Sequence, residues 1–101
     1  MMKESRVKNL DLATLRSFVT IAKTGSMTRA AAGLFMTQSA ISMQIKRLEV
    51  SLGLTVFERT AKGMVATSTG EQLLGYATKM LDLNDRLLGV SLRWIMKANL
   101  G

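Results

Sequence analysis

The side chains of this 101-residue chain can act through hydrogen bonds and through electrostatic interactions. The sequence contains no Cys and no His. A zinc finger, a thiolate metal site, a disulfide framework and a nucleophile activated by a His or Cys base are therefore excluded. No cofactor is expected, and an enzyme is not expected because the side chain that usually exchanges protons near neutral pH is missing.

The most informative polar side chains would share one face of a helix. If the segment from Thr37 to Leu52 is helical, its outward face carries Gln38, Ser39, Ser42, Met43, Lys46 and Arg47. Short polar side chains in the first turns of a helix let its backbone approach base edges in the major groove of DNA, and basic residues further along meet phosphates. The alternative is an ordinary solvated helix face, on which Arg47 pairs with Glu49 or Asp11.

Positive charge is concentrated in the first two-thirds of the chain. The chain holds 14 Lys and Arg against 7 Asp and Glu. Residues 1–67 carry ten of the basic and four of the acidic residues, and the remainder is nearly balanced. Such a surface attracts polyanions, which include DNA, RNA and an anionic membrane, although it can also serve solubility alone.

Three helices are predicted to position the polar face. Asp11 can cap the first, and its apolar stripe runs from Leu12 to Ala22 before Gly25 ends it. Ser26 or Thr28 can cap a short second helix of small residues. Thr37 can cap the third, whose apolar residues fall at Ile41, Ile45, Leu48 and Leu52 before Gly53.

The second and third predicted helices, joined by a Phe35-Met36 turn, form a helix-turn-helix. Residues 55–67 then predict a small hairpin that starts at Val56 and turns at Lys62-Gly63. Ser68 and Glu71 fit a capping box that opens a long helix.

The long helix carries an apolar stripe that a compact domain of this size cannot cover alone, so a partner must bury it. Asn84 interrupts the stripe and can either fix the register of a helical seam or lie at its edge. The seam is predicted from the following residues: Leu73, Leu74, Ala77, Met80, Leu81, Asn84, Leu87 and Leu88. The chain is thus predicted to be mainly α, with a head at residues 1–67 and a long amphipathic helix at 68–101, for which a resemblance to a known family implies the role of linker and dimerisation helix.

In the order and spacing of its fragments, the chain resembles the N-terminal domain of LysR-type transcriptional regulators, a winged helix-turn-helix followed by a linker helix. The fragments are GSMTRAAAGL from Gly25, TQSAISMQIKRLE from Thr37, LGLTVFER ending at Arg59 and TSTGEQLL from Thr67. The resemblance implies a bacterial regulator that binds double-stranded DNA as a homodimer, with two recognition helices in successive major grooves.

The resemblance also assigns site residues. It implies base contacts by Gln38, Ser39, Ser42 and Met43. The residues expected at phosphates or in the wing are Ser26, Thr28, Thr37, Lys46, Arg47, Arg59 and Lys62; for Arg59 a structural salt bridge is an equal alternative. Ser39 stands where many relatives have Pro, and Met43 where Arg, Gln or His is frequent. Met43 can instead contact a thymine methyl group.

Further expectations concern partners and location. In such regulators a ligand-sensing domain follows the linker helix, so an effector is expected to act only through a C-terminal domain that is absent here. Tetramer formation in a full-length protein stays open. No membrane span or signal peptide is predicted, and the default location is the cytoplasm, at the nucleoid. The alternative function is a helical interaction module without specific DNA binding.

Overall fold

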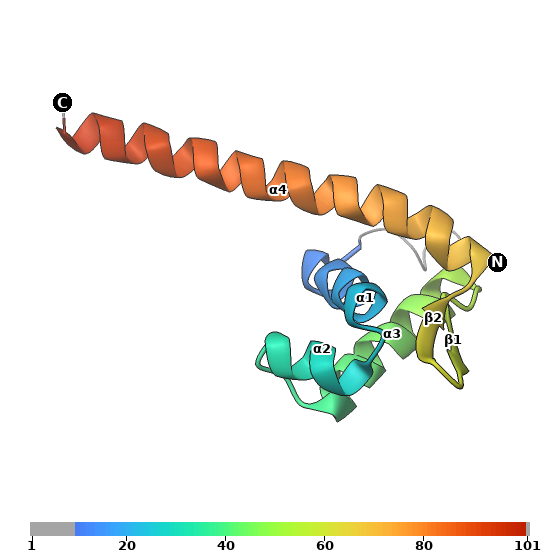
Figure 1. Ribbon diagram of the computed structural model, residues 1–101. Helices are drawn as coiled ribbons and strands as arrows, with labels where there is room; N and C mark the ends of the chain where they lie inside the picture. The colour runs from blue at the N-terminus through green and yellow to red at the C-terminus, as the bar shows by residue number, and fades with distance from the viewer. Residues whose placement is uncertain (1–9, 101) are drawn as a thin grey trace.

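The computed structural model describes the backbone of residues 10–100 and the side chains of residues 10–90 and Lys97. Its elements follow the order α1 (Leu12–Thr24), α2 (Met27–Gly33), α3 (Gln38–Leu52), β1 (Phe57–Thr60), β2 (Gly63–Ala66) and α4 (Ser68–Leu100). The first three helices and the hairpin form a head, and α4 runs past the head and projects well beyond it (Figure 1). The predicted winged helix-turn-helix with a long C-terminal helix is confirmed.

The helix ends lie where the capping residues predicted them. The side chain of Asp11 accepts a hydrogen bond from the Ala13 N–H, and Gly25 ends α1 in a left-handed conformation. Ser26, rather than Thr28, caps α2 by accepting from the Arg29 N–H at 3.1 Å. Thr37 caps α3 through the Ala40 N–H, and Gly53 ends it.

The core lies where α1, α3 and the hairpin meet. Phe18, Ile41 and Val56 are fully buried, and the rings of Phe18 and Phe57 pack edge to face with centroids 5.4 Å apart. An aromatic pair in this geometry stabilises a fold beyond the area it buries. Ser17, the one polar side chain that is buried among the described residues, donates a hydrogen bond to Oε1 of Gln44. The α3 stripe predicted at Ile41, Ile45 and Leu48 is therefore confirmed.

The structure contains the predicted hairpin, but its turn lies one residue earlier than predicted. β1 begins at Phe57, Val56 stays outside it, and Thr60 pairs with Gly63, which leaves Ala61 and Lys62 as the turn. Gly63 adopts φ 113°, and a Cβ there would lie 2.6 Å from the Gly25 carbonyl oxygen. The next residue, Met64, donates its N–H to that same carbonyl at 3.0 Å, so the hairpin is held against the end of α1.

The start of α4 corrects the predicted capping box. The hydroxyl of Thr67, not of Ser68, accepts from the N–H of Gly70 at 2.9 Å, and it donates to the Thr55 carbonyl at 2.8 Å. With Thr67 as the cap, the third helical position is Gly70, so Glu71 falls one residue too late to reach back. Thr67 thus fastens the helix start to the segment that precedes the hairpin.

The first turns of α4 pack on the head, which corrects part of the predicted seam. Ala77 is 2% exposed and Leu81 is 6% exposed, and Leu73 and Leu74 are half-buried against the same core. For Ala77 and Leu81 the expectation that a partner buries them is wrong, because both are already buried in the single chain, where α4 packs on α1. For Leu73 and Leu74, which stay partly exposed, it remains a prediction. Among the described side chains of α4, the large apolar residues left exposed are Tyr76, Met80, Leu83, Leu87, Leu88 and Val90.

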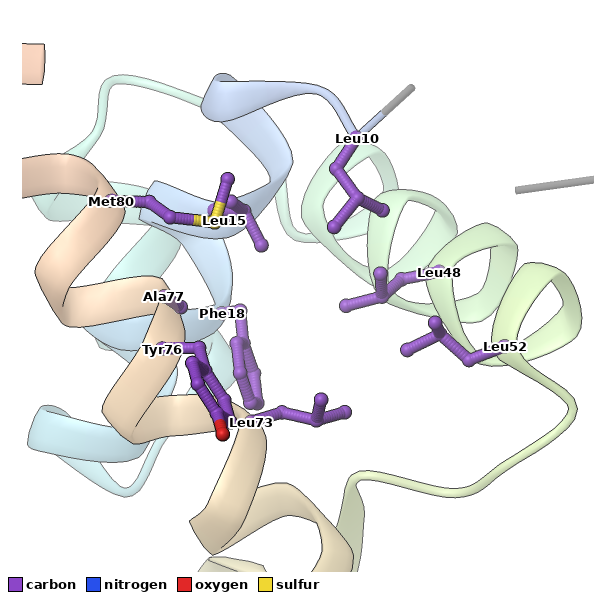
Figure 2. A pocket seen from close by; sticks show the side chains of 9 residues that line it. All are labelled: Leu10, Leu15, Phe18, Leu48, Leu52, Leu73, Tyr76, Ala77 and Met80. Carbon is purple, nitrogen blue, oxygen red and sulfur yellow. The ribbon is translucent and has the colours of Figure 1, made fainter. Parts of the chain in front are cut away.

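A small apolar cavity of about 50 Å³ lies between α1, α3 and α4. Figure 2 shows Leu48 and Leu52 of α3 on one side of it, facing Leu73 and Tyr76 of α4. Pockets for small-molecule ligands usually measure several hundred Å³. This cavity is therefore a packing gap beneath α4 rather than an effector site.

Candidate nucleic-acid interface

The turn between α2 and α3 sets the angle at which α3 is presented. The N–H of Met36 bonds to the Ala31 carbonyl at 2.8 Å, and the N–H of Phe35 bonds to the Ala32 carbonyl at 3.3 Å. These two bonds close the end of α2 in the pattern that commonly terminates helices, with Phe35 in the left-handed conformation at φ 57°. Buried Ile41 and Ile45 then anchor α3 to the other helices.

The opposite face of α3 is exposed from Gln38 to Arg47, which is nearly three turns. It carries all four residues predicted to face bases and both predicted cations: Gln38, Ser39, Ser42, Met43, Lys46 and Arg47, each of them exposed. The structure therefore brings these six residues together on one open surface. Amide, hydroxyl and thioether groups come first along the helix and the cations follow, an order that suits base edges first and phosphates beyond them.

One hydrogen bond connects the start of α2 to the start of α3. The hydroxyl of Thr28 donates to Oε1 of Gln38 at 3.2 Å. This contact fixes the direction of the Gln38 amide and leaves its NH₂ group without a partner among the described residues. An NH₂ group oriented in this way can donate a hydrogen bond to an acceptor on a base edge.

The predicted phosphate contacts differ in accessibility. Thr28 and Thr37 are exposed, whereas Ser26 is half-buried. The hydroxyl oxygens of Ser26 and Thr37 already accept from helix N–H groups, so each has its hydrogen left to donate. Of the three, Ser26 offers the least surface to a ligand.

The cations of α3 and the hairpin are not in ion pairs within the described residues. Among those residues, the ion pairs join Arg16 to Asp85 and Arg86 to Asp82. Glu49, a predicted alternative partner of Arg47, instead accepts from the Val56 N–H at 2.8 Å. Arg59 and Lys62 are exposed on the hairpin. The salt-bridge alternatives for Arg47 and Arg59 are therefore not seen.

Two carboxylates of α4, Asp82 and Asp85, each bind a guanidinium group. Hydrogen bonds from Arg16 and then from Asn84 hold the pKa of Asp85 below its ordinary value of 3.8. The two carboxylates are thus charged partners of arginines and do not form an acid–base pair. The described part of the chain also places no three His, Cys, Asp or Glu side chains where they could share a metal ion.

Sequence reasoning missed Phe35 as a surface residue. Its side chain is 97% exposed, immediately before the start of α3. The sequence places it in the predicted turn, but the left-handed backbone that aims the ring outward depends on how α2 ends. The exposure of Tyr76, Leu83 and Val90 was missed for a related reason, because the part of α4 that the head covers depends on the crossing of two helices.

Across the described residues, no helix combines the length and apolarity that a membrane crossing requires.

Comparison with known proteins matches this arrangement to one family. The family profile described as "Bacterial regulatory helix-turn-helix protein, lysR family" matches residues 12–71. The transcriptional regulator DgdR of Burkholderia cepacia is 43% identical over 81 residues, which are 80% of this chain and 28% of that protein. The regulator PecT of Dickeya dadantii is 44% identical over 79 residues, 78% of this chain and 25% of that protein.

Solved structures of regulators from the same family have a similar fold. A crystal structure of a BenM DNA-binding domain in complex with catB site 1 DNA superposes with a TM-score of 0.79 at 33% identity and covers 83% of this chain and 94% of that one. The chain spans about a quarter of the length of the curated relatives it matches. Its helix-turn-helix, its hairpin wing and the match over residues 12–71 together show that the chain belongs to the lysR family of bacterial regulatory helix-turn-helix proteins and carries the DNA-binding domain of such a regulator.

Proposed function

We propose that this domain binds double-stranded DNA sequence-specifically as a homodimer and so directs a bacterial transcription regulator to its sites. The observation that carries the proposal is the open polar face of α3, which a packed three-helix head holds in place. The similar BenM domain is bound to DNA in its crystal structure, which supports the same role for this chain.

In this proposal the first turns of α3 enter the major groove. Gln38 donates its free amide NH₂ to a base acceptor, and Ser39 and Ser42 are short enough to bond base edges without holding the helix away. Met43 is half exposed and apolar, so it suits a thymine methyl group rather than a guanine edge.

Phosphate contacts surround this base-reading surface. Lys46 and Arg47 lie one turn further along α3 and reach the strands that border the groove. The hydroxyls of Thr37 and, with less surface, Ser26 donate to phosphates near the starts of α3 and α2. The hydroxyl hydrogen of Thr28 is already donated to Oε1 of Gln38, so Thr28 acts by holding the Gln38 amide rather than by donating to a phosphate. Arg59 and Lys62 extend the contact on the hairpin, which acts as the wing.

The division into a DNA-binding head at residues 1–67 and a linker helix at 68–101 belongs to the same proposal. On α4, one exposed apolar face is free for a second copy. Tyr76, Met80, Leu83, Leu87 and Val90 are exposed and follow at intervals of four, three, four and three residues. This is the spacing of a two-helix seam, and it includes Met80 and Leu87 of the seam that the sequence predicted. Leu88, which was also predicted there, is exposed as well.

The resemblance to LysR-type regulators implies that two copies of α4 pair in antiparallel orientation, and the spacing is compatible with it. In an antiparallel arrangement centred on position 85, Met80 faces Val90 of the partner subunit and Leu83 faces Leu87 of the partner subunit, so apolar residues meet in each layer. Arg86 then approaches its own copy. Its ion pair with Asp82, at 3.1 Å, offsets part of that repulsion. Asn84 points to Asp85 rather than to this seam.

The proposal also covers the location, effector binding and assembly of the full-length regulator. We place it in the cytoplasm, at the nucleoid, without catalytic activity, and with any effector bound by a domain outside these residues. Tetramer formation would also depend on such a domain.

Selection of bound fragments from a random DNA library tests the DNA-binding proposal. We expect the wild type to enrich one sequence, and Gln38→Ala to relax the preference with a loss of about 1–3 kcal/mol. Lys46→Ala should weaken binding to all sequences alike and lower the salt dependence by about one ion, whereas the exposed Lys23→Ala on α1 should leave both unchanged. Equal binding of every probe by all variants would mean that α3 does not read DNA and would favour a pure interaction module.

A further inference from the structure

Phe35 is the most exposed of the large apolar side chains that the structure describes. Its side chain is 97% exposed, at the end of the turn that leads into α3. It therefore contributes almost no packing to the folded domain. None of the base or phosphate contacts proposed above uses it.

The backbone of Phe35 is also unfavourable for its residue type. With φ 57°, it lies in the left-handed region and closes the end of α2, a position usually taken by Gly or Asn. A bulky residue there stores strain. Since Gly would close the same turn without strain, and the ring packs against nothing, the presence of Phe at this position indicates a contact outside the chain.

The position of Phe35 places it at the margin of the α3 surface. The α2–α3 turn and the N-terminal end of α3 lie on the side of the head away from α4 (Figure 1). Gln38 follows three residues later, and the residues before the turn, Ala32 and Gly33, are small and exposed. No large side chain from this part of α2 therefore shields the ring from a ligand that occupies the α3 face.

The polar groups that follow Phe35 favour DNA over an apolar protein surface. Gln38, three residues after Phe35, is exposed, and it is bonded to exposed Thr28. An apolar protein partner would have to desolvate these groups without pairing them, which is unfavourable. DNA offers them phosphates and base acceptors, and it offers the ring the C5-methyl groups of thymines and the apolar faces of deoxyriboses.

We propose that Phe35 contacts an apolar part of DNA at the edge of the groove that α3 occupies and adds to sequence preference there. This inference rests on the proposed DNA binding and extends its contact surface beyond the residues of α3. The contact surface on DNA is either a thymine methyl group or a deoxyribose, and the experiment below separates the two.

The test compares Phe35→Gly, Phe35→Leu and Val50→Ala, where Val50 is an exposed apolar residue near the other end of α3. On the sequence that the wild type selects, Phe35→Gly should lose about tenfold in affinity, the size expected for one aromatic contact to a nucleotide. Phe35→Leu should lose less, and Val50→Ala should bind like the wild type. The melting temperature of Phe35→Gly should be no lower than that of the wild type, because a strained residue without packing has been replaced.

Uracil substituted for one thymine of the selected sequence at a time identifies the apolar group, because a thymine that Met43 contacts is then tested separately. Weaker binding of the wild type, with no further loss for Phe35→Gly, identifies a thymine methyl group. Unchanged binding of the wild type, while Phe35→Gly is still weakened, identifies the deoxyribose.

The inference can fail separately from the proposed function. It is overturned if Phe35→Gly binds the selected DNA as tightly as the wild type while Gln38→Ala is impaired; the ring would then be available to a protein partner. A loss of affinity accompanied by a lower melting temperature would also overturn it, because Phe35 would then be structural. If the wild type selects no sequence at all, the proposed function itself fails.

Discussion

A guanidinium nitrogen of Arg16 lies 2.9 Å from Oδ1 of Asp85, although 69 positions separate the two residues. This ion pair joins α1 of the head to α4 beyond the point where Leu81 is buried. Among the described residues it is the one ion pair between the two elements, so it bears on the angle at which the head is held.

The Arg16–Asp85 pair predicts a pH-dependent contribution to stability. The pKa of Asp85 is below 3.8 in the folded chain, so the contribution should be fully present above that value and lost as the pH falls through the lower, folded-state pKa. Asp85→Asn should lower the melting temperature slightly at pH 7, and the difference from the wild type should vanish in strong acid. Asp82→Asn is the control, since its ion pair with Arg86 lies within α4; a difference for Asp85→Asn that persists unchanged into acid would contradict the assignment.

Leu81 and Leu87 should separate folding from dimerisation. Leu81 is buried against the head, so Leu81→Ala should destabilise the fold by about 2–5 kcal/mol, and Leu81→Asp should unfold the head. Leu87 is exposed in the proposed seam, and Leu87→Asp should give a folded monomer. Sedimentation combined with circular dichroism distinguishes the two outcomes. A wild type that is monomeric at micromolar concentration would remove the seam from the proposal.

Glu49 should stabilise the link between α3 and the wing. Its carboxylate accepts from the N–H of Val56, a fully buried residue, at 2.8 Å. Glu49→Ala leaves this donor without a partner and should reduce the free energy of unfolding by about 1–3 kcal/mol. Glu49→Gln retains an acceptor oxygen and should lose less, which denaturant melts can measure. Exposed Glu58→Ala on β1 is the control, and an equal loss for both alanine variants would argue against a specific role for Glu49.

Gly70 and Gly75 should respond oppositely to replacement by Ala. A Cβ at Gly70 would lie 2.2 Å from the Val56 carbonyl oxygen, whereas a Cβ at Gly75 meets nothing within 4 Å. Gly70→Ala should therefore destabilise the domain by about 1–3 kcal/mol or more as backbone is forced apart. Gly75→Ala, within α4, should stabilise it by about 0.5–1 kcal/mol. Thermal unfolding of both variants checks the contrast, and a tolerated Gly70→Ala would show that α4 does not start in close contact with Val56.

The head was largely predictable from its sequence because its helices are marked by local chemistry. Asp11, Thr37 and Gly53 act on backbone groups within a few residues of themselves, so their capping roles can be predicted without knowledge of the fold. The polar face of α3 was predictable for the same reason, since the buried Ile41 and Ile45 determine which residues point outward.

The remaining features depend on contacts between distant segments. Thr67 replaces Ser68 as a cap because it also bonds to Thr55. Leu81 is buried because α4 crosses α1, and a stripe in the sequence does not indicate which part a neighbouring helix covers. The proposed seam on α4 includes Tyr76, Leu83 and Val90, which lie outside the predicted stripe, and it can be proposed only once the side of α4 that packs on the head is known.

The hydrogen bond between the Met64 N–H and the Gly25 carbonyl has a consequence for DNA shape. This bond holds the wing against the junction of α1 and α2, so it fixes the distance between the wing tip and the first turn of α3. In the proposed complex, a site whose groove is too wide or too narrow for that gap has to deform, and the ease of deformation depends on its sequence. Base steps that neither α3 nor the wing touches would then influence affinity through their stiffness.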